Sequence, residues 1–265
     1  MGQSRELAPL LLRDRVLLIG GLVVVTVVTW LYTIDMSVGG HEGHHAHHHQ
    51  HHGLAAAVTP HAEHSMSIGA LTLMWIVMMI AMMLPSAGPV GITHARFVRA
   101  RNGGEPAYLT GAFLVGYCVV WAVFSTLAAF AQVFLERHEL MSPVAMALFS
   151  NAAGGAALIG AGLFQFSSLK KSCLHRCRTP LAFIMTEWRD GVSGSFVMGL
   201  KNGIFCLGCC WALMLLLFVG GVMSMLWMGA LTALMLFEKL GPRGDRVAQV
   251  AGVAMVAGGL AMLFA

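Results

Sequence analysis

Apolar segments of about twenty residues dominate this sequence and restrict it to a small set of folds. Hydrophobic residues make up 57% of the chain and charged residues only 11%. A bilayer core is about 30 Å thick, and roughly 20 apolar residues in an α-helix cross it. In hydrocarbon every backbone polar group must be paired within the protein, which favours helices. The sequence therefore predicts an all-α fold, a polytopic membrane helix bundle.

We expect about seven transmembrane spans, and some of their boundaries stay open. The predicted positions are about 16–34, 67–86, 107–131, 144–166, 203–219, 222–237 and 247–264. The fifth and sixth spans are short and share Gly220 and Gly221, so a single re-entrant hairpin is the alternative; the fifth could also begin near Ser195. The first span is too long for a signal peptide and lacks a small-residue cleavage site, so we expect it to be retained.

Basic residues between the spans indicate how the chain is oriented. Three Lys or Arg precede the first span, three follow the second, six follow the fourth and three follow the sixth, which places 15 of 16 on one side and leaves Arg137 on the other. Cytoplasmic loops carry such an excess. We therefore expect a cytoplasmic amino terminus, an outer carboxyl terminus and a multi-pass protein of the bacterial cytoplasmic membrane. The net charge of +4 reflects this topology and indicates no nucleic-acid partner.

The chain is expected to have three regions. Residues 1–34 form the amino terminus and first transmembrane helix, 35–66 an extracytoplasmic histidine-rich loop, and 67–265 a polytopic membrane domain with a cysteine-containing cytoplasmic loop at 167–194. Within that inner loop, the stretch from Leu181 to Trp188 is apolar with polar ends. It is expected to lie on the membrane as a short amphipathic helix.

Histidine is concentrated in the predicted outer loop, which contains ten of the 13 histidines. Neutral imidazole is a common ligand of divalent transition metals, and a flexible loop can fold several around one ion. The alternative is a low-complexity loop whose composition has drifted toward histidine. We interpret the loop as a metal-collecting segment. Its candidate ligands are His41, His44, His45, His47, His48, His49, His51, His52, His61 and His64.

Five of the six cysteines form two tight clusters on the predicted cytoplasmic side. Cys206, Cys209 and Cys210 lie three and four residues apart, so on a helix Cys206 shares a face with the other two. Cys173 and Cys177 lie in the inner loop among basic residues, whose positive field favours the metal-binding thiolate. Soft thiolates select Cu(I), zinc or an iron–sulfur cluster. The alternative is that these cysteines pack as small apolar residues.

The second span contains methionines at helical spacing. Met74, Met78 and Met82 form one stripe, and Met79 and Met83 form a neighbouring one. Thioether sulfur is a soft, neutral ligand for Cu(I), so a methionine ladder could carry cuprous ion without burying a charged side chain. Packing is the alternative, because methionine is a common gap-filler in apolar cores.

Other signatures of chemistry are not found in the sequence. There is no phosphate-binding loop and no HExxH or GxSxG motif. No Asp or Glu and no histidine falls inside a predicted span, which gives no indication of a proton relay or a haem site. Pro85 is expected to kink the second span and free backbone carbonyls. We therefore expect no enzymatic activity.

Three segments together resemble an uncharacterised bacterial family of predicted metal-binding integral membrane proteins: MWIVMMIAMMLPSAGP, KSCLHRCRTPLAFIMTEWRDG and MGLKNGIFCLGCCWALMLLLFVGGVMSMLWM. The likeness covers about Met66 to Lys239, and the stretch that ends in GCCWALM is its most specific part. The resemblance implies a membrane fold and metal binding, with no established activity. It carries over Met82, Met83, Pro85, Cys173, Cys177, Cys206, Cys209, Cys210 and Trp211.

The resulting hypothesis is a membrane protein that imports copper or delivers it to a membrane metalloenzyme. The outer histidines collect copper, and Met66 with Met78, Met82 and Met83 accepts Cu(I). The inner cysteines then bind it and pass it to a cytoplasmic acceptor such as a metallochaperone. This order runs from borderline to soft ligands.

Two alternatives remain open. One is a zinc- or nickel-binding protein that uses the histidine loop as a buffer. The other is a structural subunit or assembly factor of a larger membrane complex. For the latter, small residues in the fourth span would let partner helices approach closely, although they would serve packing within the chain equally well. These residues are Gly154, Gly155, Gly160 and Gly162.

Overall fold

The computed structural model describes residues 16, 19–37, 67–102, 106–142, 147–148 and 150–264. Over these residues the chain is helical apart from one very short antiparallel ladder, which confirms the predicted all-α class. The elements are an N-terminal helix Ile19–Ser37, α2 Ile68–Asn102, α3 Pro106–Arg137, β1 Met141–Ser142, β2 Ala147–Leu148, α4 Asn151–Phe164, α5 Ser168–Arg178, α6 Pro180–Glu187, α7 Gly191–Leu215, α8 Leu217–Gly220, α9 Met225–Leu240 and α10 Gly244–Phe264. The N-terminal helix continues to Ser37, past the predicted start of the outer loop at residue 35, and residues 38–66 with all the predicted histidine ligands lie outside the described residues.

Five helical segments in the described part are long and apolar enough to cross a membrane: the N-terminal helix, α2, α3, α7 continued by α8, and α10. The pair formed by α4 and α5 meets the same criterion together but bends by 63° at its break, which raises the number to as many as six. Helix α9 has only 16 residues. The expected count of seven spans and the orientation of the amino terminus stay predictions.

Several boundaries differ from those expected. Helices α2 and α3 extend well beyond the predicted 67–86 and 107–131. Helix α4 begins at Asn151 rather than near residue 144, because Met141 and Ser142 pair with Leu148 and Ala147 in the ladder. Helix α7 begins at Gly191, close to the earlier of the two starts considered for the fifth span.

The predicted inner loop is folded into helices. Helix α6 spans nearly the stretch where a short helix was expected, and α5 precedes it. Ser167 caps α5 by accepting a hydrogen bond from the Lys170 backbone N–H at 3.1 Å. Pro180 opens α6, where its missing N–H leaves no intrahelical bond unmade. The cysteines of this region are therefore held on a helix.

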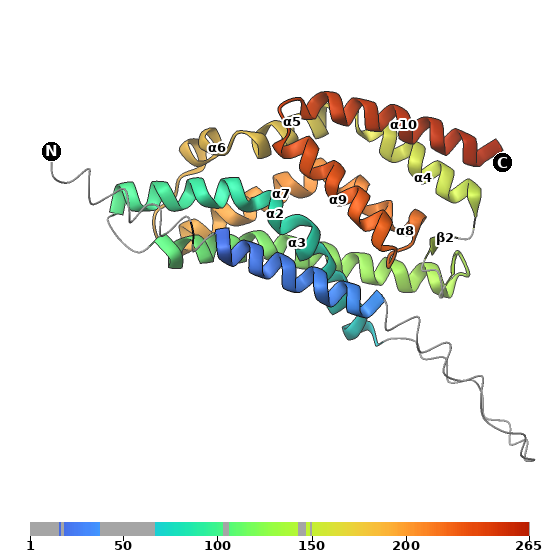
Figure 1. Cartoon of the computed structure of the whole chain (residues 1–265), viewed down its shortest axis with the longest axis horizontal. Coiled ribbons are helices and arrows are strands. Elements are labelled where there is room, and N and C mark those ends of the chain that lie inside the picture. Colours follow the sequence, from blue (N-terminus) through green and yellow to red (C-terminus); the bar gives the residue numbers. More distant parts are fainter. Residues whose placement is uncertain are drawn as a thin grey trace, which may run out of the picture.

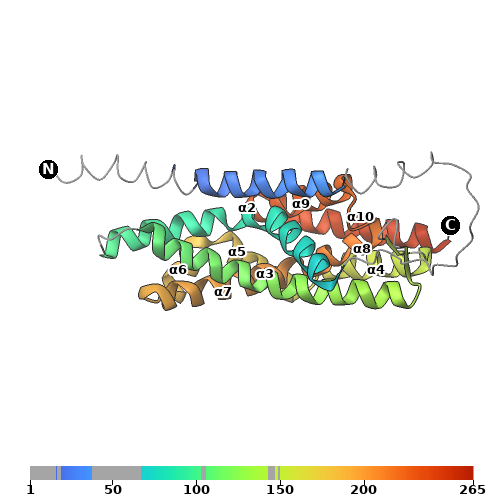
Figure 2. The same cartoon turned by 90° about the horizontal axis from the view of Figure 1, so that it is seen from below.

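The helices run roughly side by side along one long axis (Figures 1 and 2). The closest-packed pairs are α3 with α7, α4 with α10, and α2 with α3. Glycines permit these approaches, because a Cβ at Gly116 or Gly199 would overlap the facing backbone of α7 or α3. A Cβ at Gly155 or Gly162 would similarly meet the backbone of α10. Two of the fourth-span glycines therefore serve packing within the chain.

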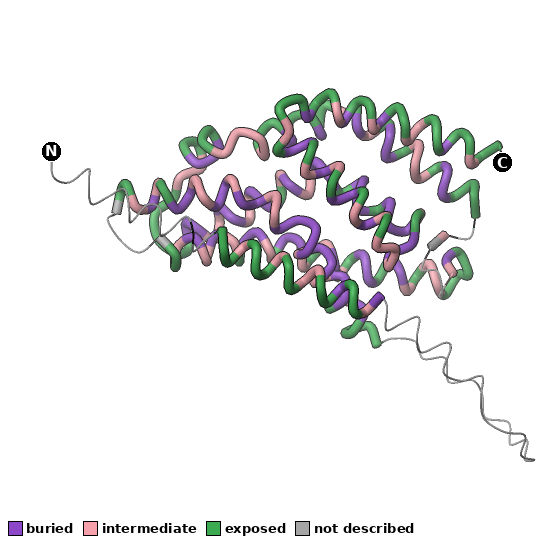
Figure 3. The backbone as a smooth tube through the Cα atoms, in the orientation of Figure 1, coloured by how far each residue is buried: buried purple, intermediate pink, exposed green. Residues whose placement is uncertain are grey.

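Burial is concentrated where α2, α3, α7 and α9 face one another, and the outward faces are exposed (Figure 3). Many exposed side chains are large and apolar, including Val24 of the N-terminal helix, Leu127 of α3 and Val250 of α10. In water such surfaces would be unfavourable, whereas lipid tails accommodate them. These long apolar helices are compatible with a multi-pass membrane protein.

Helix α2 bends along its length (Figure 1) and carries Pro85 and Pro89 inside it. Pro85 has no N–H to offer to the carbonyl of Ala81, four residues earlier. The indole N–H of Trp30, from the N-terminal helix, donates to that oxygen at 3.1 Å. The proline thus frees one carbonyl, as expected, and a neighbouring helix pairs with it.

Candidate metal centre

The three cysteines of α7 lie on one buried face of that helix. Cys206 is 3% exposed, and Cys209 and Cys210 are each 1% exposed. The thiols of Cys209 and Cys210 both donate to the carbonyl oxygen of Cys206, at 3.0 and 2.9 Å. These back-bonds fix the two side chains along the helix. The shared face predicted from the spacing is thus observed.

Helices α2 and α3 complete the surroundings of these thiols. The Sδ atom of Met83 lies 3.9 Å from the Sγ of Cys210. The Tyr117 hydroxyl donates to the Met83 carbonyl at 3.0 Å and lies 3.0 Å from the Sγ of Cys206. Ser86 lies next to them, with its Oγ 3.9 Å from the Cys206 sulfur. Two thiols, a thioether and two hydroxyls therefore meet at the centre of the bundle.

The cysteines of α5 join the same region. A Cβ at Gly208 of α7 would lie only 2.7 Å from the Sγ of Cys173, so this glycine lets α5 approach closely. The side chain of Cys177 lies near the thiol of Cys209. The two cysteine clusters, far apart in the sequence, form one continuous group. Cys118 lies apart, on a groove between the N-terminal helix, α2 and α3.

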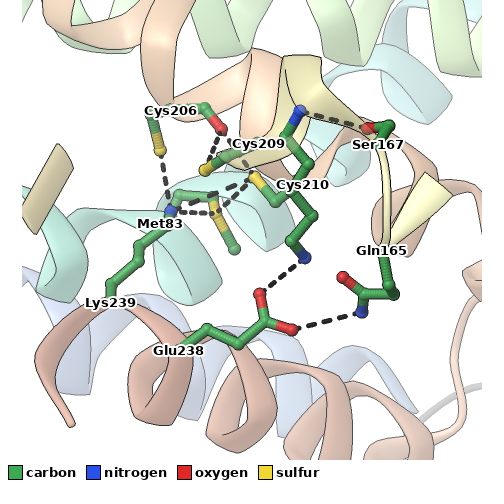
Figure 4. Close-up of polar contacts among 9 residues, drawn as sticks. Met83, Gln165, Ser167, Cys206, Cys209, Cys210, Glu238 and Lys239 are labelled. Carbon is green, nitrogen blue, oxygen red and sulfur yellow. Dashed lines mark hydrogen bonds and ion pairs between the residues drawn. The ribbon is translucent and has the colours of Figure 1, made fainter. Parts of the chain in front are cut away.

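A buried lysine points into the thiols (Figure 4). Lys239, in the last turn of α9, is 6% exposed. Its Nζ lies 2.9 Å from the Sγ of Cys206 and 4.0 Å from that of Cys210. The same nitrogen lies 4.0 Å from the Sδ of Met83 and 3.3 Å from the Oγ of Ser86. The ammonium is thus surrounded by three sulfur atoms and one hydroxyl.

A second buried lysine lies beside the first and has a carboxylate partner. The Nζ of Lys170 in α5 is 2.7 Å from Oε2 of Glu238, and these side chains are 1% and 2% exposed. Gln165 donates from Nε2 to the other carboxylate oxygen at 3.1 Å. This pair joins α5 to α9, and Figure 4 shows Glu238 with the two contacts of its carboxylate. An ion pair removed from water in this way is costly to break.

Lys170, Glu238 and Lys239 were not selected from the sequence, because all three were placed in loops. Glu238, which follows the predicted sixth span, lies within α9 and is buried. The helical spacing of the apolar residues before Lys239 does indicate that this lysine lies on a buried face. The buried face of α9 includes Met228, Thr232, Met235 and Lys239, at steps of four and three.

The methionines predicted in the second span are all buried, but they are placed differently with respect to the thiols, and Met66 lies outside the described residues. Met83 contacts Cys210, whereas Met78 and Met82 pack in the surrounding hydrophobic core at 0% and 1% exposure. The same core contains further buried methionines that the sequence hypothesis did not use as ligands: Met141, Met214, Met228 and Met235. Burial is expected both for methionines that only pack in the core and for methionines that form a Cu(I)-carrying ladder, so it does not separate the two.

The histidines contribute differently from expectation. His94 lies within α2, beyond the predicted second span, and is fully buried, with its Nδ1 3.2 Å from the Thr110 hydroxyl. Its ring stacks on Phe113. His175, between the α5 cysteines in sequence, is exposed. Within the described residues, no group of three or more His, Cys, Asp or Glu side chains is arranged to hold a metal ion.

The fold and the site define an all-helical protein that has helices apolar enough for a membrane and a buried cluster of thiols and thioether at its centre. The sequence matches the model of the PpoB2 copper chaperone family over residues 72–262. The chain therefore belongs to this family, and membership indicates copper handling. No curated protein and no solved structure matches the chain.

Proposed function

We propose that this protein binds copper as Cu(I) at the sulfur cluster, by which we mean the thiols of Cys206 and Cys210 in α7 and the thioether of Met83 in α2. It catalyses no reaction, and it either imports copper or delivers it to a membrane metalloenzyme. Cys206, Cys210 and Met83 are the primary ligands. Cys209, Cys177 and Cys173 form the continuation toward α5. The outer histidines and the remaining methionines of α2 are proposed to supply copper from the opposite side.

One observation carries this proposal: thiols from α7 and the thioether of α2 converge in the core around a single buried position. Cys206, Cys210 and Met83 all lie within 4.0 Å of one point, which the Lys239 nitrogen occupies. Soft thiolate and thioether donors select Cu(I). A metal–thiolate bond is shorter, about 2.3 Å in zinc sites, so the sulfurs must draw inward around an ion. Methionine is flexible enough to follow.

The continuation through α5 suggests how copper leaves. Cys177 lies beside Cys209, and Cys173 lies against Gly208, one residue before Cys209. Neighbouring thiols permit stepwise ligand exchange, in which a new thiolate binds before an old one departs. Helix α5 also carries exposed Lys171 and Arg176. An acceptor with an acidic surface is therefore the partner that fits this end of the bundle.

The family and the donor set favour copper over the zinc or nickel alternative. Zinc sites in proteins use cysteine, histidine and carboxylate ligands in a closed tetrahedral shell. The position described above has a thioether on one side and an ammonium in its middle. A zinc site would therefore have little use for Met83, and substitution of this methionine separates the two metals.

The experiment is elemental analysis of detergent-purified protein expressed without a histidine tag. It compares the intact chain with a chain in which residues 41–64 are deleted, and places Cys206→Ser, Cys210→Ser and Met83→Leu in the deleted form. Cys118→Ser is the matched control, because this cysteine lies on another face of α3. We expect about one copper per chain to survive the deletion and the control, and to be lost or strongly reduced in the three ligand variants.

Two results would contradict the proposal. Wild-type copper content in both cysteine variants would remove the sulfur cluster from the account. Zinc or nickel that disappears with residues 41–64 would leave the membrane part without a metal role. That second result would favour an assembly factor with an accessory metal buffer, for which a stoichiometric co-purifying subunit is the expected sign.

A further inference from the structure

Lys239 places its ammonium among the sulfur atoms of the cluster. Its ammonium lies 2.9 Å from the Cys206 sulfur, and the Cys210 and Met83 sulfurs are both 4.0 Å away. Among the contacts described for the Lys239 nitrogen, none is to a carboxylate. A buried lysine normally requires a charged or well-ordered polar partner. Here the partners are the same donor atoms that a soft metal ion would use.

The neighbouring contacts hold the backbone around Lys239 independently of its side chain. Glu238 is anchored by Lys170 at 2.7 Å and by Gln165 at 3.1 Å. Just after the helix, the Arg178 guanidinium donates to the Gly241 carbonyl at 2.8 Å. The end of α9 is thus tied to α5, and the lysine can leave the sulfurs by rotating its own four-carbon stem.

We propose that Lys239 is a displaceable counter-cation, so that its ammonium and Cu(I) occupy the sulfur cluster alternately. This inference rests on the proposed function. When copper enters, the ammonium leaves with its proton and moves toward the carboxyl end of α9, where the helix dipole favours a cation. When copper passes to an acceptor, the ammonium returns. The lysine therefore lowers copper affinity and assists release, as a delivery protein requires.

The charges of this exchange can be counted for the two cysteine ligands. With the ammonium in place, the site contains one positive charge and two neutral thiols. When Cu(I) replaces the ammonium, Cys206 and Cys210 each release a proton to water and bind as thiolates. When copper leaves, the two thiols take up protons again and the ammonium returns. Selectivity for Cu(I) over Zn(II) comes from the softness of the thiolate and thioether donors.

The test measures the affinity of the full-length protein for Cu(I) by competition with a chromophoric Cu(I) chelator. Binding is followed by the ultraviolet copper–thiolate absorption, which imidazoles do not produce. We expect Lys239→Leu to bind Cu(I) about tenfold or more tightly and to release it to the chelator more slowly. Lys239→Arg keeps the charge and should not gain affinity. Lys171→Leu is the control for general electrostatics, because Lys171 is exposed on α5.

A second measurement needs no variant. Acetylation of the wild-type protein with a soluble reagent, followed by mass spectrometry, should show Lys239 protected without copper and labelled once Cu(I) is bound. Two results would overturn the exchange: unchanged Cu(I) affinity in Lys239→Leu, or equal labelling of Lys239 with and without Cu(I). The sulfur site itself would still stand if Cys206→Ser abolishes the copper–thiolate absorption. If Cys206→Ser binds Cu(I) with wild-type absorption, the sulfur site itself is wrong and the exchange falls with it.

Discussion

Lys170 and Lys239 are two buried lysines at the same end of the bundle, and they differ in what surrounds their ammonium groups. Lys170 faces the Glu238 carboxylate at 2.7 Å, and Gln165 pairs with the other oxygen of that carboxylate. Lys239 faces sulfur atoms and a hydroxyl. Because Glu238 and Lys239 are adjacent in α9, one turn of helix presents both environments (Figure 4).

The comparison separates a structural charge from an exchangeable one. Removing one member of a buried ion pair leaves the other charge uncompensated, so Lys170 and Glu238 hold α5 against α9. Loss of the Lys239 side chain leaves thiols, a thioether and a hydroxyl, which can exist uncharged in an apolar core. The first lysine is therefore expected to maintain the fold around the site, and the second to compete with its cargo.

The largest expected effect comes from Lys170→Leu. This change strands the Glu238 carboxylate and should lower the free energy of unfolding by about 3–5 kcal/mol. Lys239→Leu should change it by no more than about 1 kcal/mol, since no carboxylate loses its partner. The free energy of unfolding of both variants is measured by titrating the detergent-solubilised protein with a denaturing detergent and following the loss of helical circular dichroism.

The double variant Lys170→Leu with Glu238→Leu provides the control for this prediction. It removes both charges together and should recover most of the lost stability, because no charge is left unpaired. Equal losses in the Lys170 and Lys239 single variants would show that the two lysines do not differ in the way described.

A smaller effect is expected from Tyr117→Phe, which changes the sulfur side alone. The tyrosine hydroxyl donates to the Met83 carbonyl and contacts the Cys206 sulfur, while Ser86 also donates to that carbonyl at 2.8 Å. The carbonyl therefore keeps a partner, and the stability cost should be about 1 kcal/mol. Cu(I) affinity should fall by about tenfold, because a group that positions a ligand is lost. Chelator competition measures it, and an unchanged affinity would exclude a positioning role.

The helical class and the apolar segments were predictable from composition, because a bilayer admits few alternatives to helices. The boundaries were less predictable. Helix α2 continues past Pro85, since Trp30 compensates the freed carbonyl of Ala81. Such a compensation depends on a helix more than fifty residues away in the sequence. The ladder of Met141 and Leu148 likewise shortened the fourth predicted span through a pairing that hydropathy does not encode.

The site was predictable in its ligand types but not in its charges. The spacing of Cys206, Cys209 and Cys210 placed them on one face, and Met83 was among the selected methionines. The union of the two cysteine clusters depends on Gly208, where the missing side chain lets Cys173 approach. Lys239 was assigned to a loop because the sixth predicted span was ended before the charged residues Glu238 and Lys239. In fact the charge of Lys239 is buried among the ligands.

The most direct test of the central claim is X-ray absorption spectroscopy at the copper edge, on copper-loaded protein that lacks residues 41–64. The account predicts an edge typical of Cu(I) and a first shell that contains only sulfur, from Cys206, Cys210 and Met83. A first shell of nitrogen or oxygen, or the outer-shell scattering of imidazole, would show that copper binds elsewhere. That result would contradict the sulfur centre.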